Sequence, residues 1–419
     1  MACSKPSKKT EDFFGNVPDL VIDKILENLP IRMASQTSVL SKLWRHGWLS
    51  LERLNFGFDF QKQQKNKDGS CNWQKSSLII SSILFHHNGP VRDFCLYVPN
   101  DADGAQTNLS QWISFLAKNG VQRITIDNSD GHIITSYIFW CNELVYLQLA
   151  NFSLNSPPTC FHGFPKLKHL ELRNVEFTEQ NTFCSLIENC RMLVTLKLDD
   201  WLGMDHVVID APSIQTLILN GDFESLAFRN VRNLKNVSMC LKKMPEKLIT
   251  VETVDSVNLL ASSCQLKSIE FNGHLCKFLA AGGIIGSPPV TFNNLDKLYL
   301  CNLDLSDFAI LRYVLSMIEC CPYIKNFYIS VIPGKNVGQH IFDFNHKYKL
   351  DHLREVNIKG ITGSSVELKL VEYLLAISAS LENLFFQSGK CENDSELKMS
   401  RALMRFPRAS TKASLVCLE

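Results

Sequence analysis

Apolar residues recur along most of the chain in a fixed pattern, L-x-x-L-x-L, in which other apolar residues replace some of the leucines. Clear copies begin at positions 144, 167, 193, 214, 266, 295, 324, 353 and 381, and weaker copies begin at 91, 121 and 234. Successive copies start between 20 residues (214 to 234) and 32 residues (234 to 266) apart. A hexapeptide that recurs this often predicts a chain built from stacked repeats rather than a conventional α/β sheet.

Each hexapeptide has the alternation of a β-strand. In Leu170-Glu171-Leu172-Arg173, successive side chains point to opposite faces, so the leucines are expected to enter a core while Glu171 and Arg173 face outward. One unit is too small to bury its apolar edge alone, and stacking neighbours closes a continuous core. The spacing fits leucine-rich repeats, whose period is roughly 20–29 residues.

The later repeats have room for a helix before each strand. Leu311, Val314, Leu315 and Ile318 keep helical spacing, as do Val371, Leu374 and Leu375. Three copies also end in a shared tail that begins with Asn151, Asn174 or Asn302, where an Asn is expected to bond backbone groups between stacked coils. The predicted fold class is therefore α/β: a curved parallel sheet whose strands line a concave face, with helices or loops on the convex side.

The first forty or so residues have a different pattern. Ile22, Ile25, Leu26 and Leu29 form one stripe of a helix, with Pro18 at its start and Pro30 at its end. A second amphipathic stretch contains Val39, Leu40, Leu43, Trp44 and Trp48 and breaks near Gly47. Short helices in so few residues cannot bury two tryptophans well, so part of this apolar surface must meet the repeats or a partner.

Composition and charge argue against several classes of function and location. Lys plus Arg (43) against Asp plus Glu (42) leaves a net charge of +1, which gives no field to attract nucleic acid or anionic lipid. The chain has neither a signal-peptide core near its start nor an apolar run of 18 residues, so no membrane association is expected and the location is expected to be cytoplasmic, nuclear or both. The 15 scattered cysteines then favour reduced, buried thiols such as Cys95, Cys141, Cys240 and Cys301 over disulfides or zinc ligands.

Sequence motifs for catalysis are weak. The glycine-rich segment Gly282 to Gly286 lacks the Lys-Ser/Thr of a phosphate loop, and the pairs His86-His87 and Cys320-Cys321 have no nearby ligand or catalytic set. No G-x-S-x-G or H-E-x-x-H motif occurs. We therefore expect no cofactor, no metal and no intrinsic enzyme activity, although a repeat protein can assemble a site from distant residues.

Two further segments give a specific resemblance. Val17-Pro18, Ile25-Leu26, Leu29-Pro30-Ile31 and Ser38-Val39-Leu40-Ser41-Lys42-Leu43-Trp44 resemble an F-box of the plant type, with Val17 in place of Leu and Leu43 in place of Arg. Residues 405–410 (Arg-Phe-Pro-Arg-Ala-Ser) and the apolar tail 415–418 resemble the FBD module. The chain as a whole is thus similar to the plant F-box/FBD/leucine-rich-repeat family, which implies a tail at 1–12, an F-box at 13–60, repeats at 61–350, and last repeats with an FBD-like end at 351–419.

The resemblance implies a role. F-box helices dock on a SKP-type adaptor and through it on cullin and RING subunits, while the repeats hold a protein substrate for ubiquitination by other subunits. By position, the resemblance assigns adaptor binding to Pro18, Ile22, Ile25, Leu26, Leu29, Pro30, Ile31, Val39, Leu40 and Trp44. Each of these could instead belong to the core of the small domain. A repeat scaffold without ligase assembly, a chain that pairs with the adaptor alone, and a ligase with a small molecule in the cavity remain alternatives.

Outward strand positions are the default binding surface of a repeat protein, because stacking presents them together. Among them we select a tentative substrate-binding set of mixed charges and aromatic rings, which suits a protein or peptide more than a phosphate backbone. The set is Tyr146, His169, Glu171, Arg173, Lys197, Asp199, Tyr299, Tyr328 and Phe385.

Overall fold

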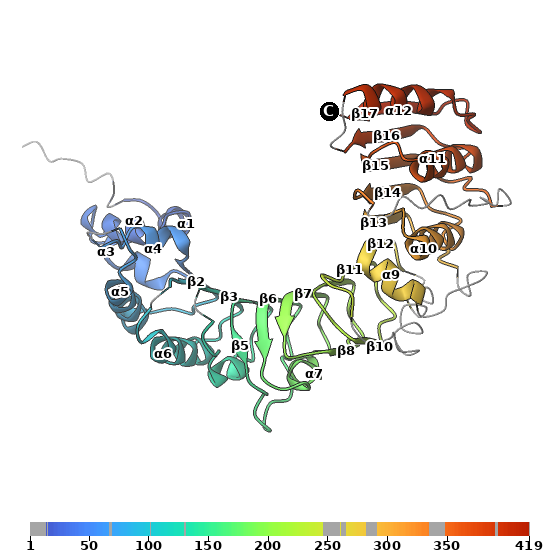
Figure 1. Cartoon of the computed structure of the whole chain (residues 1–419). Coiled ribbons are helices and arrows are strands. Elements are labelled where there is room, and N and C mark those ends of the chain that lie inside the picture. Colours follow the sequence, from blue (N-terminus) through green and yellow to red (C-terminus); the bar gives the residue numbers. More distant parts are fainter. Residues whose placement is uncertain are drawn as a thin grey trace, which may run out of the picture. The chain divides into compact units, whose positions relative to one another are not determined.

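The computed structural model describes residues 14, 16–66, 69–100, 102–129, 131–245, 260, 265–281, 291–334, 348–389 and 393–418, with backbone alone for 393–398. The predicted tail at 1–12 and the glycine-rich segment at 282–286 lie outside these residues. The chain divides into two compact units: residues 1–168 with 174–178, and residues 169–173 with 179–419. Each unit is described by itself (Figure 1).

Short helices open unit 1. They are α1 (Asp19–Glu27), α2 (Ile31–Gln36), the 3-10 turn η1 (Thr37–Val39), α3 (Trp44–Gly47) and the 3-10 turn η2 (Trp48–Ser50). Pro18 and Pro30 stand immediately before α1 and α2, where the missing N–H costs no helical hydrogen bond. The second predicted stretch is divided between η1 and α3. A Cβ added to Gly47 would lie 2.9 Å from the Leu26 side chain, so α3 packs closely on α1.

A parallel sheet follows in unit 1. Strands β1 (Arg53–Phe56), β2 (Asp93–Val98), β3 (Arg123–Asn128) and β4 (Tyr146–Ala150) pair in that order, and β5 (Ser153–Leu154) pairs with residues 176–177. The connections hold α4 (Phe58–Lys62), α5 (Trp73–His86), α6 (Ala105–Lys118) and the 3-10 helix η3 (Ser136–Trp140). Phe94, Ile124 and Leu147 occupy one register position and are buried, which makes a continuous core beneath the sheet.

Unit 2 continues the same architecture. Strands β7 (Thr195–Leu202), β9 (Thr216–Asn220), β11 (Asn236–Cys240), β12 (Ser268–Asn272), β13 (Lys297–Leu303), β14 (Asn326–Val331), β15 (Glu355–Ile361), β16 (Asn383–Ser388) and β17 (Ser414–Leu418) pair in parallel in that order. Strand β6 (His169–Phe177) is shared between the two units. Strands β8 (His206–Asp210) and β10 (Ser225–Arg229) form a separate parallel pair.

Helices cover one face of the unit 2 strands. They are α7 (Thr182–Ile187), α9 (Gly273–Ala281), α10 (Phe308–Glu319), α11 (Ser365–Ile377) and α12 (Asn393–Arg405), and in Figure 1 α9, α10 and α11 lie on the same side of their strands. Leu298 and Leu300 of β13 are buried, whereas Tyr299 between them is half-buried. In each unit, we call the strand face that carries the outward side chains, opposite the buried side chains, the open face.

The predicted leucine-rich-repeat fold is confirmed. In each of the twelve hexapeptides a strand begins at the third residue, from β2 to β16, and the predicted helices around Leu311 and Val371 are α10 and α11. The sheet has one further strand before the first hexapeptide and one after the last, and neither was predicted. The sheet begins at Arg53, inside the range assigned to the F-box, and the FBD-like tail adds β17 as a further strand beside β16.

The predicted asparagines adopt the left-handed backbone that such a turn needs, with φ of 59° at Asn151, 49° at Asn174 and 55° at Asn302. Their side chains do not all bond backbone groups. Asn174 Nδ2 donates to Asn151 Oδ1 at 2.6 Å, so neighbouring coils are joined side chain to side chain. Backbone contacts of this kind occur at two other asparagines: Asn128 Nδ2 donates to the carbonyl of Asn151 at 3.0 Å, and Asn272 Nδ2 donates to the carbonyl of Leu241 at 2.6 Å.

Candidate functional site

Exposed apolar side chains concentrate on the N-terminal helices. Of the 23 large hydrophobic residues exposed among the described residues, 8 lie between positions 14 and 43. We define the N-terminal apolar surface by the seven of them on or between α1 and α3: Leu20, Val21, Ile25, Met33, Val39, Leu40 and Leu43. Solitary exposed apolar residues are normal on a protein surface, whereas a concentration of them makes this surface the candidate interaction site of the helices.

Helix α1 has two apolar faces. Ile22 and Leu26, one turn apart, are buried, and Leu26 meets α3 at Gly47. Val21 and Ile25, also one turn apart, are 45% and 41% exposed. The stripe predicted from spacing alone therefore divides between the core of the helical module and its surface.

The segment between α2 and α3 is exposed in the same way. Val39 is 87% exposed and Leu43 is 47% exposed. Trp44 turns inward instead: its ring stacks edge-on against Phe14 at 6.2 Å, and its Nε1–H donates to the Phe14 carbonyl at 3.1 Å. Trp44 thus anchors the chain before α1 and leaves Val39 and Leu43 to the solvent.

The structure separates the predicted adaptor-binding residues into two groups. Pro18, Ile25, Pro30, Val39 and Leu40 are exposed and Leu29 is half-buried, so these six are accessible. Ile22, Leu26, Ile31 and Trp44 are buried and form the core of the module, where they position the others. Sequence reasoning missed Leu20, Val21 and Met33, which lie off the stripe, and it placed Leu43 in the second amphipathic stretch without assigning it to adaptor binding.

The predicted substrate-binding residues fall on the open face. All are half-buried except Arg173, which is exposed, and each alternates with buried neighbours along its strand. In unit 2, pairing places Lys197, Tyr299, Tyr328 and Phe385 at the same register position of their strands. Lys197 also pairs with Glu171 at 2.9 Å, so two predicted residues of β6 and β7 meet directly.

Two tyrosines dominate the centre of this row. The rings of Tyr299 and Tyr328 are stacked with centroids 4.5 Å apart and planes 8° apart. The Tyr328 hydroxyl donates to Glu355 Oε1 at 3.1 Å. Burial, the hydrogen bond to Glu355 and the charge of that carboxylate raise the pKa of Tyr328 to about 12. Tyr328 is therefore a fixed neutral donor at physiological pH, suited to contact rather than to acid–base chemistry.

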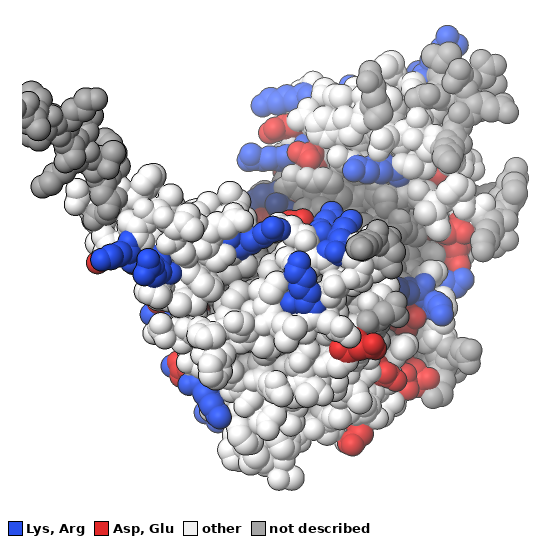
Figure 2. Space-filling view, turned by 90° about the vertical axis from the view of Figure 1, so that its left-hand side faces the viewer, with Lys and Arg blue, Asp and Glu red and all other residues white. Residues whose placement is uncertain are grey.

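The outward row of unit 1 is charged. Arg53, Asp93, Arg123 and Tyr146 share one register position on β1 to β4. Asp93 Oδ2 lies 3.6 Å from Nε of both arginines, and the Arg123 guanidinium lies over the Tyr146 ring at 4.3 Å. Figure 2 shows Lys and Arg side chains separated among uncharged residues on its visible face, which gives no continuous basic surface for a nucleic acid.

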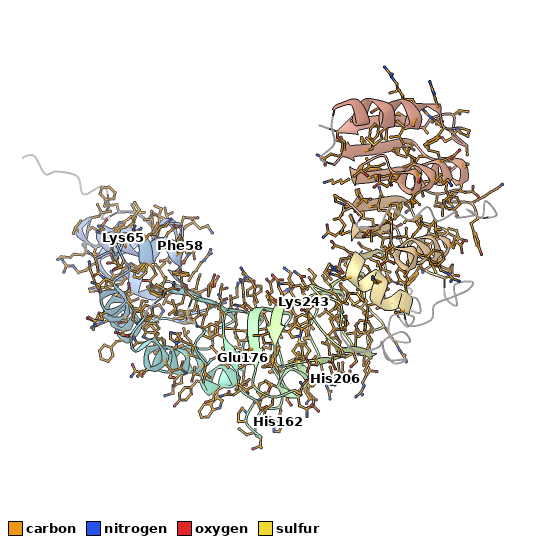
Figure 3. The ribbon with its side chains drawn as sticks, viewed as in Figure 1. Phe58, Lys65, His162, Glu176, His206 and Lys243 are labelled. Atoms are coloured by element: carbon orange, nitrogen blue, oxygen red, sulfur yellow. The ribbon has the colours of Figure 1, made fainter. Side chains whose placement is uncertain are left out.

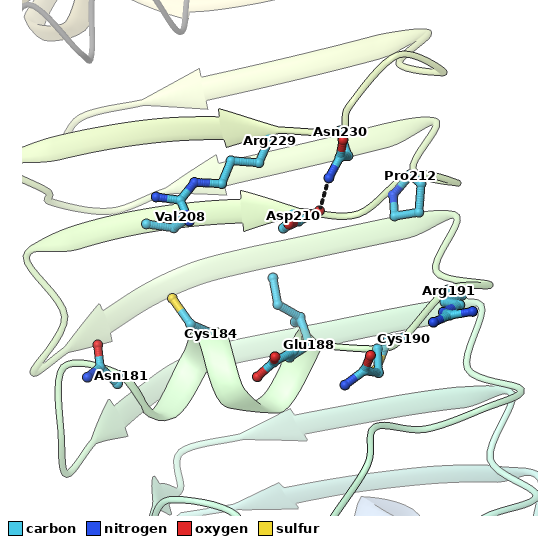
Figure 4. Close-up of a pocket in the computed structure, with 12 residues that line it drawn as sticks. Asn181, Cys184, Glu188, Cys190, Arg191, Val208, Asp210, Pro212, Arg229 and Asn230 are labelled. Carbon is cyan, nitrogen blue, oxygen red and sulfur yellow. Dashed lines mark hydrogen bonds between the residues drawn. The ribbon is translucent and has the colours of Figure 1, made fainter.

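A cavity of about 640 Å³ lies between α7 and the strands β8 and β10 (Figure 4). It is lined by side chains of both signs, including Glu188, Asp210 and Arg229, and by Cys184. Burial raises the pKa of the Cys184 thiol, so at neutral pH it is not an activated nucleophile. Figure 3 shows the described side chains of both units and labels Phe58, the first residue of α4.

The described cysteines are free thiols. Cys141 is buried as predicted, but Cys95, Cys240 and Cys301 are half-buried at outward strand positions, which corrects the prediction that apolar surroundings in sequence mean a core position. Burial raises the pKa of Cys240 and of Cys301 to about 11, so both remain protonated. Among the residues with described positions, no three His, Cys, Asp or Glu side chains gather as a metal site. No helix in the described ranges has the length and hydrophobicity to span a bilayer.

Comparison with known proteins agrees with this architecture. The family model for the leucine-rich repeats of the FBD-associated F-box protein At5g56370 matches residues 109–267. The F-box/FBD/LRR-repeat protein At1g13570 of Arabidopsis thaliana is 28% identical over 98% of this chain and 99% of its own length. F-box/LRR-repeat protein 13 of the same plant is 24% identical over 97% of this chain and 96% of its own, and the putative F-box/FBD/LRR-repeat protein At2g05300 is 26% identical over 100% of both.

Proposed function

Because the chain is a relative of the plant F-box/FBD/leucine-rich-repeat proteins along nearly its whole length, we propose that it is the substrate-recognition subunit of an SCF-type E3 ubiquitin ligase. The N-terminal apolar surface binds a SKP-type adaptor, and the open face of the repeats holds the target protein. Ubiquitin transfer belongs to the cullin-bound subunits, so this chain has no catalytic role. The complex would work in the cytoplasm, the nucleus or both.

One observation supports the proposal above the others: the N-terminal helices keep apolar residues exposed although they also pack on the repeats. Helix α2 contacts strand β1, and Ile31 and Trp48 lie opposite Phe60 and Ile83 across a cavity of about 530 Å³, so the helices lie against the first repeat. Val39 and Ile25 take no part in that lining and stay exposed. A helical module that served only to cap the repeats would turn these residues inward, because exposing them costs free energy.

The decisive test is a pull-down of the full chain with a SKP-type adaptor, beside the double variant Ile25→Asp/Val39→Asp. Both side chains are exposed, so the carboxylates cost the free protein little, but at an adaptor interface they would be buried without a partner. We expect the adaptor to bind the native chain and to lose at least about tenfold in affinity for the variant, since an unpaired buried charge costs more than 1.4 kcal/mol.

The matched control is Leu202→Asp, which places the same charge on a residue that is 66% exposed in unit 2. Adaptor binding should be unchanged in this variant, and circular dichroism should show all three chains folded. If the native chain binds no adaptor isoform, or if the double variant binds as well as the native chain, the ligase proposal is wrong. The protein would then be a repeat scaffold that binds a partner without ubiquitin transfer.

A further inference from the structure

Two arginines on the open face of unit 1 share a single carboxylate. Arg53, Asp93 and Arg123 are the first outward residues of β1, β2 and β3, and they are paired in register. Their side chains are 64%, 25% and 51% exposed, so the guanidinium groups stand above the carboxylate that lies between them.

The charges of this trio do not cancel. Two guanidinium groups against one carboxylate leave an excess of one positive charge. Both Nε–Oδ2 distances are 3.6 Å, which is longer than a hydrogen bond, so the arginine N–H groups are not satisfied by Asp93. The neighbouring Arg92 differs, because its Nε lies 3.0 Å from Glu52 in a one-to-one pair.

The next carboxylate along these strands is too distant to neutralise the excess. Asp127 lies four residues beyond Arg123 on β3, roughly 13 Å away at the rise of an extended strand. Exposed charges at that separation are largely screened, because the Debye length is about 8 Å at physiological ionic strength. Asp127 also accepts a hydrogen bond from Asn151 at 3.2 Å.

One of the two guanidinium groups is held in position. Arg123 lies over the Tyr146 ring with a separation of 4.3 Å, and the Tyr146 hydroxyl donates to Gln148 at 2.7 Å. Stacking orients the planar guanidinium and leaves its edge, which carries the N–H donors, free. Such a group loses little conformational entropy when it binds a carboxylate or phosphate.

There is room beside Arg53 for a ligand. A cavity of about 570 Å³ is lined by Arg53 and Asn55 of β1, by Cys95 of β2 and by residues at the ends of α1 and α2. Its other charged lining residues are Arg32, Glu27 and Asp59, which sum to one negative charge, so the anion is expected at the Arg53 end and not deeper in the cavity.

We propose that Arg53 and Arg123 together bind an anionic group, a carboxylate or a phosphate, on the protein that the open face captures. This inference rests on the proposed function, since it names the chemistry of the captured partner. The anion bridges the two guanidinium groups above Asp93 and supplies the charge that one shared carboxylate cannot. Tyr146, predicted from sequence to touch substrate, acts as the positioning residue for Arg123.

The test uses the full chain and three fluorescent pools of degenerate peptides that differ only at the central residue: phosphoserine, glutamate or serine. We expect the phosphoserine pool, the glutamate pool or both to bind more tightly than the serine pool. The variant Arg53→Gln/Arg123→Gln should lose about tenfold in affinity for the anionic pool, the equivalent of one charge-assisted hydrogen bond. Preference between the two anionic pools identifies phosphate or carboxylate as the source.

Two further variants make the test specific. Asp93→Asn removes the competing carboxylate and should tighten anionic binding by about threefold, whereas Arg92→Gln removes a cation that is already paired and should change nothing. Equal binding of all three pools to the native chain, no binding at all, an equal loss in Arg92→Gln, or weaker binding by Asp93→Asn would overturn the proposal. The measurement needs no adaptor, so a failure of adaptor binding would overturn ligase assembly while leaving this site intact.

Discussion

Gly360 lies where β15 shifts register against β16, between Lys359 and Ile361. Its φ is +77°, in the left-handed region that side chains disfavour, and a Cβ built there would lie 2.3 Å from the carbonyl oxygen of Val331 on the neighbouring coil. Two constraints therefore act on one position: the backbone conformation and the close approach of two strands. Nothing in the hexapeptide pattern distinguishes this glycine, because both constraints arise from the stacking of coils.

The two constraints can be separated by experiment. Gly104 has nearly the same φ, +74°, but no atom within 4 Å of an added Cβ. Gly104→Ala should destabilise the protein by about 1 kcal/mol through backbone strain alone, and Gly360→Ala should add about 1–3 kcal/mol for the steric overlap. Thermal unfolding followed by circular dichroism compares the two variants. Equal destabilisation would show that the strands near Gly360 move apart at no cost.

At the scale of the element, sequence reasoning succeeded where one physical cause acts alone. Strand alternation places Leu298 and Leu300 inward and Tyr299 outward, because a strand has only two faces. Side chains project from α1 in all directions around its axis, and α1 packs on α3 with the side that carries Leu26. The apolar spacing alone could therefore not tell which of Ile22 and Ile25 is buried. The strands β8 and β10 and the arginine pair at Asp93 were also missed, since they depend on which coils become neighbours.

Neighbouring coils of unit 2 are also joined electrostatically where their strands begin. Asp296 lies 2.8 Å from Lys325 and 3.6 Å from Lys267, which precede the strands on either side of its own. The hydrogen bond from Lys325, helped by the charge of Lys267, lowers the pKa of Asp296. A carboxyl group with a lowered folded-state pKa stabilises the fold above its unfolded pKa, about 3.9, and loses that contribution as the pH falls through the folded value.

Asp296→Asn should therefore lower stability at pH 7 by up to about 1 kcal/mol, the range for partly exposed ion pairs. The difference from the native chain should shrink as the pH falls below about 4, where the Asp296 carboxyl of the unfolded chain takes up its proton, and it should vanish once the pH is below the lowered folded-state pKa. Urea unfolding at several pH values measures this difference. Asp351→Asn, at an exposed position of the same unit, is the control and should be neutral throughout. If the difference in unfolding free energy between Asp296→Asn and the native chain stayed constant with pH, the Asn side chain, and not the lost charge, would be responsible for it.

For the molecule as a whole, the proposed adaptor surface lies in one compact unit, whereas the side chains proposed to hold the substrate lie in both. The N-terminal apolar surface and the arginine pair lie in unit 1, whereas the stacked tyrosines lie in unit 2. Each unit has its own buried core, with Phe94 and Ile124 in the first and Leu298 and Leu300 in the second. In repeat proteins stability is approximately a sum of local terms, so damage to one core need not unfold the other.

Leu300→Ala tests this independence. Leu300 is 0% exposed on β13, so removing its side chain should destabilise unit 2 by about 2–5 kcal/mol. We expect hydrogen exchange to accelerate in β12 to β15 and to stay slow in α1 and β2 to β4, with adaptor affinity unchanged. Faster exchange throughout the chain, together with weaker adaptor binding, would instead show that both units unfold as one. Adaptor docking would then depend on the repeats that hold the substrate, and loss of substrate-face stability would release the chain from the ligase.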